Sequence, residues 1–270
     1  MLAGASMGVA GRLGLAMLAM QVAIGALNDW ADQARDAVTK PAKPIPSGLA
    51  TSTQALALAG AGGVGTLALS AMSGVPTLLV AALALGLGFL YDLRLSRTIW
   101  SWLPLALALP LLPIHAWLGA TGTVPTGLLG LLPIGVLAGA ALALANGLVD
   151  VERDALSNRP GAVVRLGPAR AWALHALLLA FVSVLAVLLA PAFPPGDGGR
   201  PGAGTLVPPE VLGALRTWGV NAGLAALAVG AVALRGARPG VRERGWELEA
   251  VGVAAVGLGW IAGTAASGGG

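Results

Sequence analysis

Residues 28–48 read NDWADQARDAVTKPAKPIPSG and directly follow a long apolar segment. Three aspartates and two lysines fall in this stretch, although only 10% of the chain is Asp, Glu, Lys or Arg. Charge gathered at the end of an apolar run is typical of a membrane-spanning helix that emerges into water. The stretch therefore predicts a membrane protein, and the spacing of its charges calls for a separate explanation.

The composition of the whole chain indicates the same class of protein. It has 270 residues, 56% of them hydrophobic, and a mean hydropathy of +0.82. A soluble domain carries roughly 25% charged residues, far more than this chain. The apolar runs lack the period-two alternation of a membrane β-barrel, so we expect an all-α polytopic membrane bundle. There is no cysteine, which excludes disulfides and thiolate metal sites.

Apolar segments of about 20 residues, the length that crosses a ~30 Å hydrocarbon core, recur along the chain. Eight crossings divide the loops into two sides, and one side holds 13 of the 16 basic residues. By the positive-inside rule this side faces the cytoplasm, which explains the net charge of +4 without a nucleic-acid partner. We expect one domain over residues 1–270 of a multi-pass cell-membrane protein. The eight predicted segments are residues 5–27, 49–71, 75–91, 100–119, 126–146, 168–192, 210–234 and 246–264.

The first acidic cluster follows the first apolar segment and contains Asn28, Asp29, Asp32 and Asp36. On a helix, positions 29, 32 and 36 share one face, and Asn28 lies one turn from Asp32. Carboxylates stacked in this way repel one another, and a divalent cation removes that conflict. Mg²⁺ suits such a face because it takes oxygen ligands and shares its coordination with substrate phosphates.

A second cluster ends the fifth apolar segment, in the sequence NGLVDVERD. Asn146, Asp150 and Asp154 are successive i+4 neighbours, whereas Glu152 points elsewhere. One cluster alone could be a solvated helix end. Two matching clusters on the same side of the membrane favour a shared metal site, with a charged ligand between them.

Basic residues stand close to both clusters, and the sequence YDLRLSRT adds Tyr91, Arg94 and Arg97 at the end of the third segment. Tyr91 is the only tyrosine, and it could simply be an interfacial aromatic. Carboxylates for metal, cations for phosphate oxygens and a membrane for an apolar tail together suggest a prenyl diphosphate. The other basic residues near the clusters are Lys40, Lys43, Arg153, Arg159 and Arg165.

NDWADQARD and NGLVDVERD resemble the paired acidic motifs of the UbiA superfamily of intramembrane prenyltransferases. KPAKPIPSG is similar to that family's basic, proline-containing segment, and YDLRLSRT to the loop between its third and fourth core helices. The resemblance implies a helical bundle around a central cavity with a cytoplasmic cap. It also implies Mg²⁺-dependent transfer of a prenyl group from an isoprenoid diphosphate to an aromatic or lipophilic acceptor.

The resemblance assigns roles to residues at matching positions. It implies that Asp29, Asp32, Asp36, Asp150 and Asp154 hold the metal and act in catalysis. It further implies that the diphosphate or the cap is contacted by a set of polar and basic residues. These residues are Asn28, Lys40, Lys43, Tyr91, Arg94, Asn146 and Arg159.

Two other functions use the same motifs. A membrane terpene cyclase would ionise the same diphosphate and quench the cation internally, and a non-catalytic protein would only bind the diphosphate. The UbiA family usually has nine helices, with its first acidic motif at the end of the second. Here that motif ends the first apolar segment, so we expect the family's first helix to be missing. For His115 and His175, two lone histidines in apolar segments, we expect packing or hydrogen-bonding roles.

Overall fold

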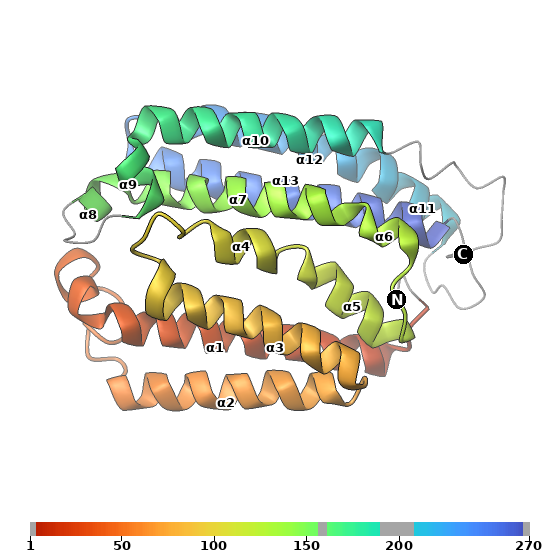
Figure 1. Ribbon diagram of the computed structural model, residues 1–270, viewed down its shortest axis with the longest axis horizontal. Coiled ribbons are helices and arrows are strands. Elements are labelled where there is room, and N and C mark those ends of the chain that lie inside the picture. The colour runs from red at the N-terminus through yellow and green to blue at the C-terminus, as the bar shows by residue number, and fades with distance from the viewer. Residues whose placement is uncertain (1–3, 156–160, 190–207, 267–270) are drawn as a thin grey trace.

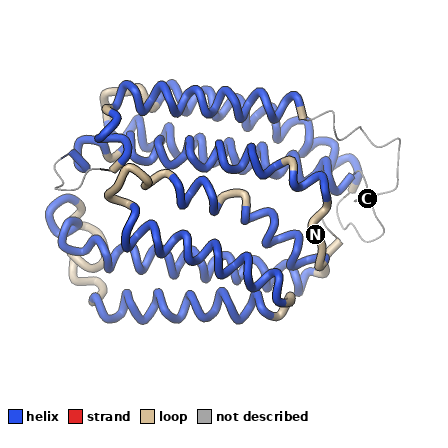
Figure 2. The backbone as a smooth tube through the Cα atoms, in the orientation of Figure 1, coloured by secondary structure: helices blue, strands red, loops and turns tan. Residues whose placement is uncertain are grey.

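The computed structural model describes residues 4–155, 161–189 and 208–266. These residues form helices and connecting loops, with no strand among them (Figure 2). The all-α prediction is confirmed. In chain order the elements are α1 (Met7–Thr39), α2 (Ser52–Ala71), α3 (Val75–Leu90), the π-helix η1 (Tyr91–Leu95), α4 (Leu103–Ala108), α5 (Leu111–Thr121), α6 (Thr126–Leu129), α7 (Leu131–Val149), α8 (Val151–Ala155), α9 (Ala162–Leu166), α10 (Pro168–Leu188), α11 (Pro209–Ala214), the π-helix η3 (Leu215–Gly219), α12 (Val220–Ala233) and α13 (Pro239–Ala266).

Seven helical stretches of the described residues are long and apolar enough to cross a membrane, so the chain is a multi-pass membrane protein. Each overlaps one of the first seven predicted segments, and the first continues 12 residues beyond its predicted end at residue 27. The eighth predicted segment, residues 246–264, lies within α13, whose first half is charged and which packs beside α7 and α12. The seven stretches are Met7–Thr39, Ser52–Ala71, Val75–Leu95, Leu103–Thr121, Thr126–Val149, Pro168–Leu188 and Leu215–Ala233.

Local signals in the sequence explain where several helices begin. The Ser6 hydroxyl accepts a hydrogen bond from the first turn of α1. Thr51 and Gln54 form a capping box at the start of α2, which satisfies backbone N–H groups that lack helical partners. Gly74, with φ of +100°, makes the sharp turn between α2 and α3. Pro110 separates α4 from α5, so the fourth predicted segment is two short helices.

The bundle has two halves, as Figure 1 shows. The N-terminal half is α1, α2 and α3, the C-terminal half is α7, α10, α12 and α13, and α4 and α5 lie between them. The largest apolar core cluster lies in the C-terminal half, around Leu128, Leu179, Leu227 and Trp260. In the N-terminal half α1 and α2 approach so closely that a Cβ at Gly62 would lie 2.8 Å from a backbone oxygen of α1.

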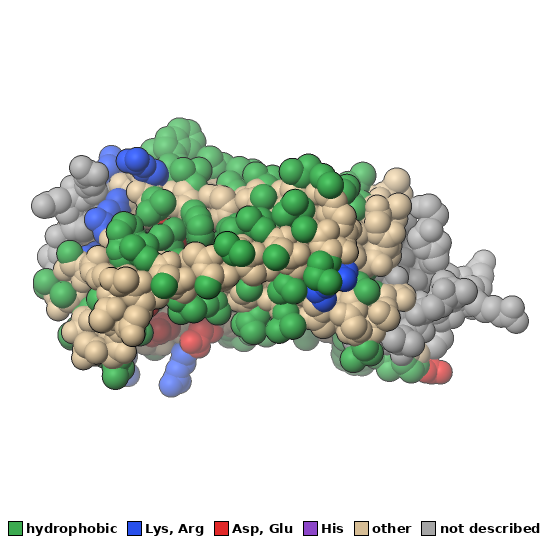
Figure 3. Space-filling view, turned by 90° about the horizontal axis from the view of Figure 1, so that it is seen from below, with side chains coloured by type: hydrophobic (Ala, Val, Ile, Leu, Met, Phe, Trp, Pro, Cys, Tyr) green, Lys and Arg blue, Asp and Glu red, His purple; other side chains and the backbone are tan. Residues whose placement is uncertain are grey.

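One end of the bundle gathers the acidic motifs and most of the basic loops. The C-terminal end of α1 lies there with α8 and α9, whereas the start of α1 and the end of α13 lie at the opposite end (Figure 1). In Figure 3 hydrophobic side chains cover the middle of the visible face, and most visible Lys and Arg side chains lie toward the motif end. This distribution is what a helical bundle needs when lipid surrounds its middle and water its ends.

Candidate active site

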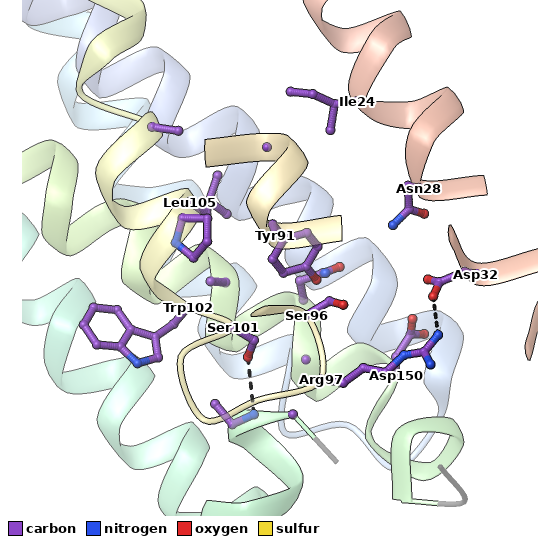
Figure 4. A pocket seen from close by; sticks show the side chains of 18 of the residues that line it. Ile24, Asn28, Asp32, Tyr91, Ser96, Arg97, Ser101, Trp102, Leu105 and Asp150 are labelled. Atoms are coloured by element: carbon purple, nitrogen blue, oxygen red, sulfur yellow. Dashed lines mark hydrogen bonds and ion pairs between the residues drawn. The ribbon is translucent and has the colours of Figure 1, made fainter. Parts of the chain in front are cut away.

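A cavity of about 410 Å³ lies between the two halves of the bundle and reaches the motif end. Its walls come from α1, α3, η1, α4, α5, α7, α8 and α9 and from the loops beside them. The part nearest the motif end, here called the mouth, is lined by the polar side chains of both acidic motifs. The inner part is apolar, with Met20, Ile24, Leu105, Leu109 and Leu112 in its wall. Figure 4 shows side chains from both halves of the bundle facing this space.

The first acidic motif lies on the last turns of α1, because this helix continues to Thr39. Lys43 Nζ lies 2.8 Å from Asp29 Oδ1 and 2.8 Å from Asp36 Oδ2, and so bridges the two carboxylates. Burial lowers the pKa of Lys43, but its hydrogen bonds to Asp29 and Asp36 outweigh this effect and raise the pKa above the ordinary lysine value. Lys43 lines the mouth, whereas Asp29 and Asp36 contact Lys43 but do not line the cavity themselves.

Asp32 is the carboxylate of α1 that lines the mouth, and it is almost fully buried. Arg35 Nη2 lies 2.5 Å from its Oδ2, and Arg97 Nη2 lies 2.6 Å from its Oδ1 (Figure 4). Arg97 comes from the loop after η1, so this pair joins α1 to the loop that follows the third predicted segment. Both arginines line the mouth as well.

The second acidic motif faces the first across the mouth. Asn146 on α7, Asp150 at its C-terminal end and Asp154 on α8 all line the cavity. Lys40 Nζ lies 3.1 Å from Asp150 Oδ2, which joins residues 110 positions apart in the chain. Arg35 Nη1 lies 3.6 Å from Asp154 Oδ1. Burial raises the pKa of the Asp154 carboxyl above its ordinary value, and Arg35 opposes that rise.

Tyr91 and Asn28 approach the mouth from η1 and α1, and both line it (Figure 4). Asn28 Nδ2 donates a hydrogen bond of 2.9 Å to Asp92 Oδ1. Asp92 is buried, and its Oδ2 accepts no hydrogen bond. The π-helix η1 begins at Tyr91, and short π-helical turns of this kind often occur at functional sites.

Two of the predicted basic residues are not among the side chains that line the cavity, for different reasons. Arg94 does not line the cavity and makes no ion pair with any described residue, whereas Arg97, three positions later, reaches Asp32. Arg159 lies outside the described residues. Near the mouth, the sequence analysis missed Arg35 and Asp92. The only signal was that Arg35 lies within NDWADQARD and Asp92 within YDLRLSRT. No spacing rule shows which distant side chain each of them would contact.

The oxygen donors suit a metal that is shared with a ligand. The described residues contain no group of three His, Asp or Glu side chains close enough to hold one ion alone. Asp36 has a buried oxygen, Oδ1, that accepts no hydrogen bond. Mg²⁺ commonly binds one or two carboxylates and completes its shell with water and phosphate oxygens. The carboxylates of the two motifs fit that pattern if an anionic ligand occupies the mouth.

A family model described as the UbiA prenyltransferase family matches residues 3–209. The chain belongs to this family. The resemblance carried by NDWADQARD and NGLVDVERD is therefore confirmed at the level of the family. The match spans both acidic motifs, every wall of the cavity and the five predicted segments from residue 49 to residue 192.

Solved UbiA structures share the fold at low sequence identity. The apo structure of a UbiA homologue from Aeropyrum pernix K1 is 18% identical, covers 96% of this chain and 91% of its own, and has a TM-score of 0.70. A UbiA homologue from Archaeoglobus fulgidus bound to GPP and Mg²⁺ is 17% identical, covers 95% and 89%, and has a TM-score of 0.66. A structure of digeranylgeranylglyceryl phosphate synthase is 13% identical, covers 96% and 86%, and has a TM-score of 0.61. No curated protein matches the chain.

Proposed function

We propose that this UbiA protein transfers a prenyl group from an isoprenoid diphosphate to a lipophilic or aromatic acceptor inside the membrane. The observation that carries the proposal is the cavity, which joins two acidic motifs and four cationic side chains at its mouth to an apolar interior. The mouth suits a metal-bound diphosphate, and the interior suits a hydrocarbon chain. The Archaeoglobus fulgidus homologue bound to GPP and Mg²⁺ supports the same assignment.

The side chains at the mouth stabilise the leaving group. During transfer the bond between the allylic carbon and the diphosphate oxygen breaks, and the diphosphate leaves with the electron pair. Lys40, Lys43, Arg35 and Arg97 line the mouth and place positive charge where this negative charge develops. Their present partners are carboxylates, so each cation can exchange a carboxylate for a phosphate oxygen without becoming unpaired.

The carboxylates of both motifs would hold Mg²⁺. These are Asp29, Asp32 and Asp36 on α1, and Asp150 and Asp154 at the end of α7 and on α8. When bound, the metal neutralises phosphate charge and so makes the diphosphate a better leaving group. Asn28, Asn146 and Tyr91 line the same mouth and supply uncharged hydrogen-bonding groups for the diphosphate.

The apolar interior protects the allylic cation. Leu105, Leu109, Ile24 and their neighbours exclude water, which would otherwise capture the cation as an alcohol. The acceptor instead donates an electron pair to the allylic carbon and releases a proton to water at the mouth. By the positive-inside rule the mouth faces the cytoplasm, and membrane lipids surround the bundle. The single-domain organisation over residues 1–270 and the contact of Arg94 and Arg159 with diphosphate stay predictions.

The direct test is a transfer assay with the full chain in lipid nanodiscs. The protein is incubated with Mg²⁺, labelled prenyl diphosphates of several lengths and a panel of aromatic and lipophilic acceptors. Acceptor-dependent prenylated product is the expected result. A cyclic hydrocarbon formed without acceptor would identify a terpene cyclase, and diphosphate binding without any product would identify a non-catalytic binder.

Variants of the two motifs then test the site itself. We expect Asp32→Ala and Asp150→Ala each to lower product formation by about 10²- to 10³-fold, as is typical when one preorganised electrostatic group is removed. Circular dichroism of the purified variants controls for loss of fold. Full activity in both variants would contradict the assignment of these carboxylates.

A further inference from the structure

The inner wall of the cavity contains one polar side chain among apolar ones, Gln21 on α1. Met20, Ile24, Ala84 and Leu112 form the wall around this level. Gln21 precedes Ile24 by three residues and Asn28 by seven, so these three side chains share the cavity face of the helix. A glutamine that lines the inner cavity of a membrane protein needs a reason, because hydrocarbon cannot satisfy its amide.

No described residue forms a hydrogen bond with the side-chain amide of Gln21. Gln21 is exposed, whereas its neighbour Met20 is buried, and the Gln21 amide has no hydrogen-bond partner among the described residues. The other glutamine on the same helix, Gln33, behaves differently: it accepts a hydrogen bond from Ser52 and donates one to the backbone oxygen of Trp30. The Gln21 amide is therefore free to bind a polar group of a ligand in the cavity.

The chemistry of this ligand follows from charge. An amide donates and accepts hydrogen bonds without carrying charge, so it suits a hydroxyl or carbonyl group. All Lys and Arg side chains that line the cavity, namely Arg35, Lys40, Lys43 and Arg97, lie at the mouth among the acidic motifs. A carboxylate or phosphate bound beside Gln21 would lack a counter-charge in a water-poor space, which costs far more than burying a neutral group.

We propose that Gln21 binds the acceptor and selects one whose inward-facing polar group is an uncharged hydroxyl or carbonyl. This proposal rests on the proposed function and names the acceptor chemistry for the same cavity. Seven residues of helix separate Gln21 from Asn28, which is about 10 Å along the axis. The hydrogen bond between the Gln21 amide and the polar group of the acceptor spans about 3 Å of that distance. The remaining distance suits a small ring system whose reactive atom points to the mouth.

The test uses near-isosteric variants and direct binding. Gln21→Met removes the amide, Gln21→Asn keeps an amide on a shorter side chain, and Gln33→Met is the matched control on the same helix. The probes are 1,4-dihydroxynaphthalene and its 2-carboxylated analogue, with geranyl diphosphate as the prenyl donor. Binding is measured by calorimetry in nanodiscs, and the KM of each substrate is measured wherever product forms.

We expect wild-type protein to bind the neutral probe more tightly than the carboxylated one. Gln21→Met should weaken binding of the neutral probe about three- to tenfold, the range expected for one hydrogen bond. Gln21→Asn should restore part of this loss, while Gln33→Met and the KM for geranyl diphosphate stay at wild-type values. Gln21→Arg should reverse the preference toward the carboxylated probe.

Equal binding of both probes, or a Gln21→Met effect confined to geranyl diphosphate, would overturn the proposal. The second result would place the prenyl chain, and not the acceptor, beside Gln21. Absence of prenylated product despite normal probe binding would count against the proposed function alone, because the binding measurement does not depend on turnover.

Discussion

Ionisable side chains have opposite roles at the cavity mouth and in the core of the C-terminal half. At the mouth, Asp32 and Asp150 each contact two basic side chains beside an open space. In the C-terminal half, His175 and Glu249 contact each other with no exposed surface and do not line the cavity. An ionisable side chain can therefore bind a ligand only where it adjoins an open space, whatever partners it has.

The buried pair ties three helices together. His175 on α10 must donate through Nδ1 to the backbone oxygen of Ala141 on α7, 3.0 Å away, because a carbonyl can only accept. Its Nε2 lies 2.9 Å from Glu249 Oε1 on α13. Gly230 on α12 lets Glu249 fit, since a Cβ at this position would lie 2.4 Å from the Glu249 Cγ. These contacts confirm the hydrogen-bonding role expected for His175, as the 3.0 Å contact with Ser70 does for His115.

The largest effect that we predict breaks this pair. Glu249→Ala leaves His175 Nε2 buried without a partner, and removal of one member of a buried pair typically costs about 3–5 kcal/mol of unfolding free energy. Denaturation of the purified protein by SDS in mixed micelles measures this loss. We expect product formation per folded molecule to stay near the wild-type value at low temperature, because the pair lies outside the cavity.

The matched variants separate loss of a partner from loss of volume. Glu249→Gln keeps the shape and one hydrogen bond to His175, so it should lose much less stability than Glu249→Ala. The double variant His175→Leu with Glu249→Leu should lose less than the two single changes added together, since it leaves no unpaired member. Strict additivity would show that the two residues do not interact as a pair.

A second prediction concerns the packing that encloses the pair. Gly252 on α13 faces α12, and a Cβ there would lie 2.8 Å from the backbone oxygen of Gly223. Gly252→Ala should therefore push α12 and α13 apart and cost about 1–3 kcal/mol. Gly257→Ala is the control on the same helix, because nothing lies within 4 Å of a Cβ at that position. Equal stability of the two variants, by the same SDS titration, would mean that the contact of α12 with α13 tolerates an added methyl group.

The sequence predicted the helical class well because lipid leaves the backbone few choices. Where no water is available, each apolar run must satisfy its own backbone groups as a helix, so composition and segment length are enough. The break between α4 and α5 at Pro110 was missed, although proline made it visible in principle. The extension of α1 to Thr39 agrees with the expectation that Asp29, Asp32 and Asp36 lie on a helix.

The site was predicted only as far as local spacing reaches. The i+3 and i+4 spacings grouped the aspartates of each motif, and the family resemblance related the two groups. Nothing local shows that Arg35 meets Asp32 and Asp154, or that Arg97 and not Arg94 reaches the mouth. Gln21 was missed because one glutamine in an apolar run has no periodic signal until the cavity is known.

The smallest predicted effect marks the boundary of the mouth. Glu152 lies between Asp150 and Asp154 in sequence, but its side chain is 62% exposed and pairs with Arg242 at 2.5 Å, away from the cavity. Arg242 also donates to the backbone oxygens of Gly236 and Ala237, so it keeps partners without Glu152. Glu152→Gln keeps an oxygen that can accept a hydrogen bond from the buried Arg242. We therefore expect it to change the unfolding free energy by about 1 kcal/mol, the size of one hydrogen bond, and to leave product formation unchanged. A loss of product as large as that of Asp150→Ala would extend the mouth to Glu152, and it would mean that solvent exposure does not separate the binding carboxylates from the structural ones.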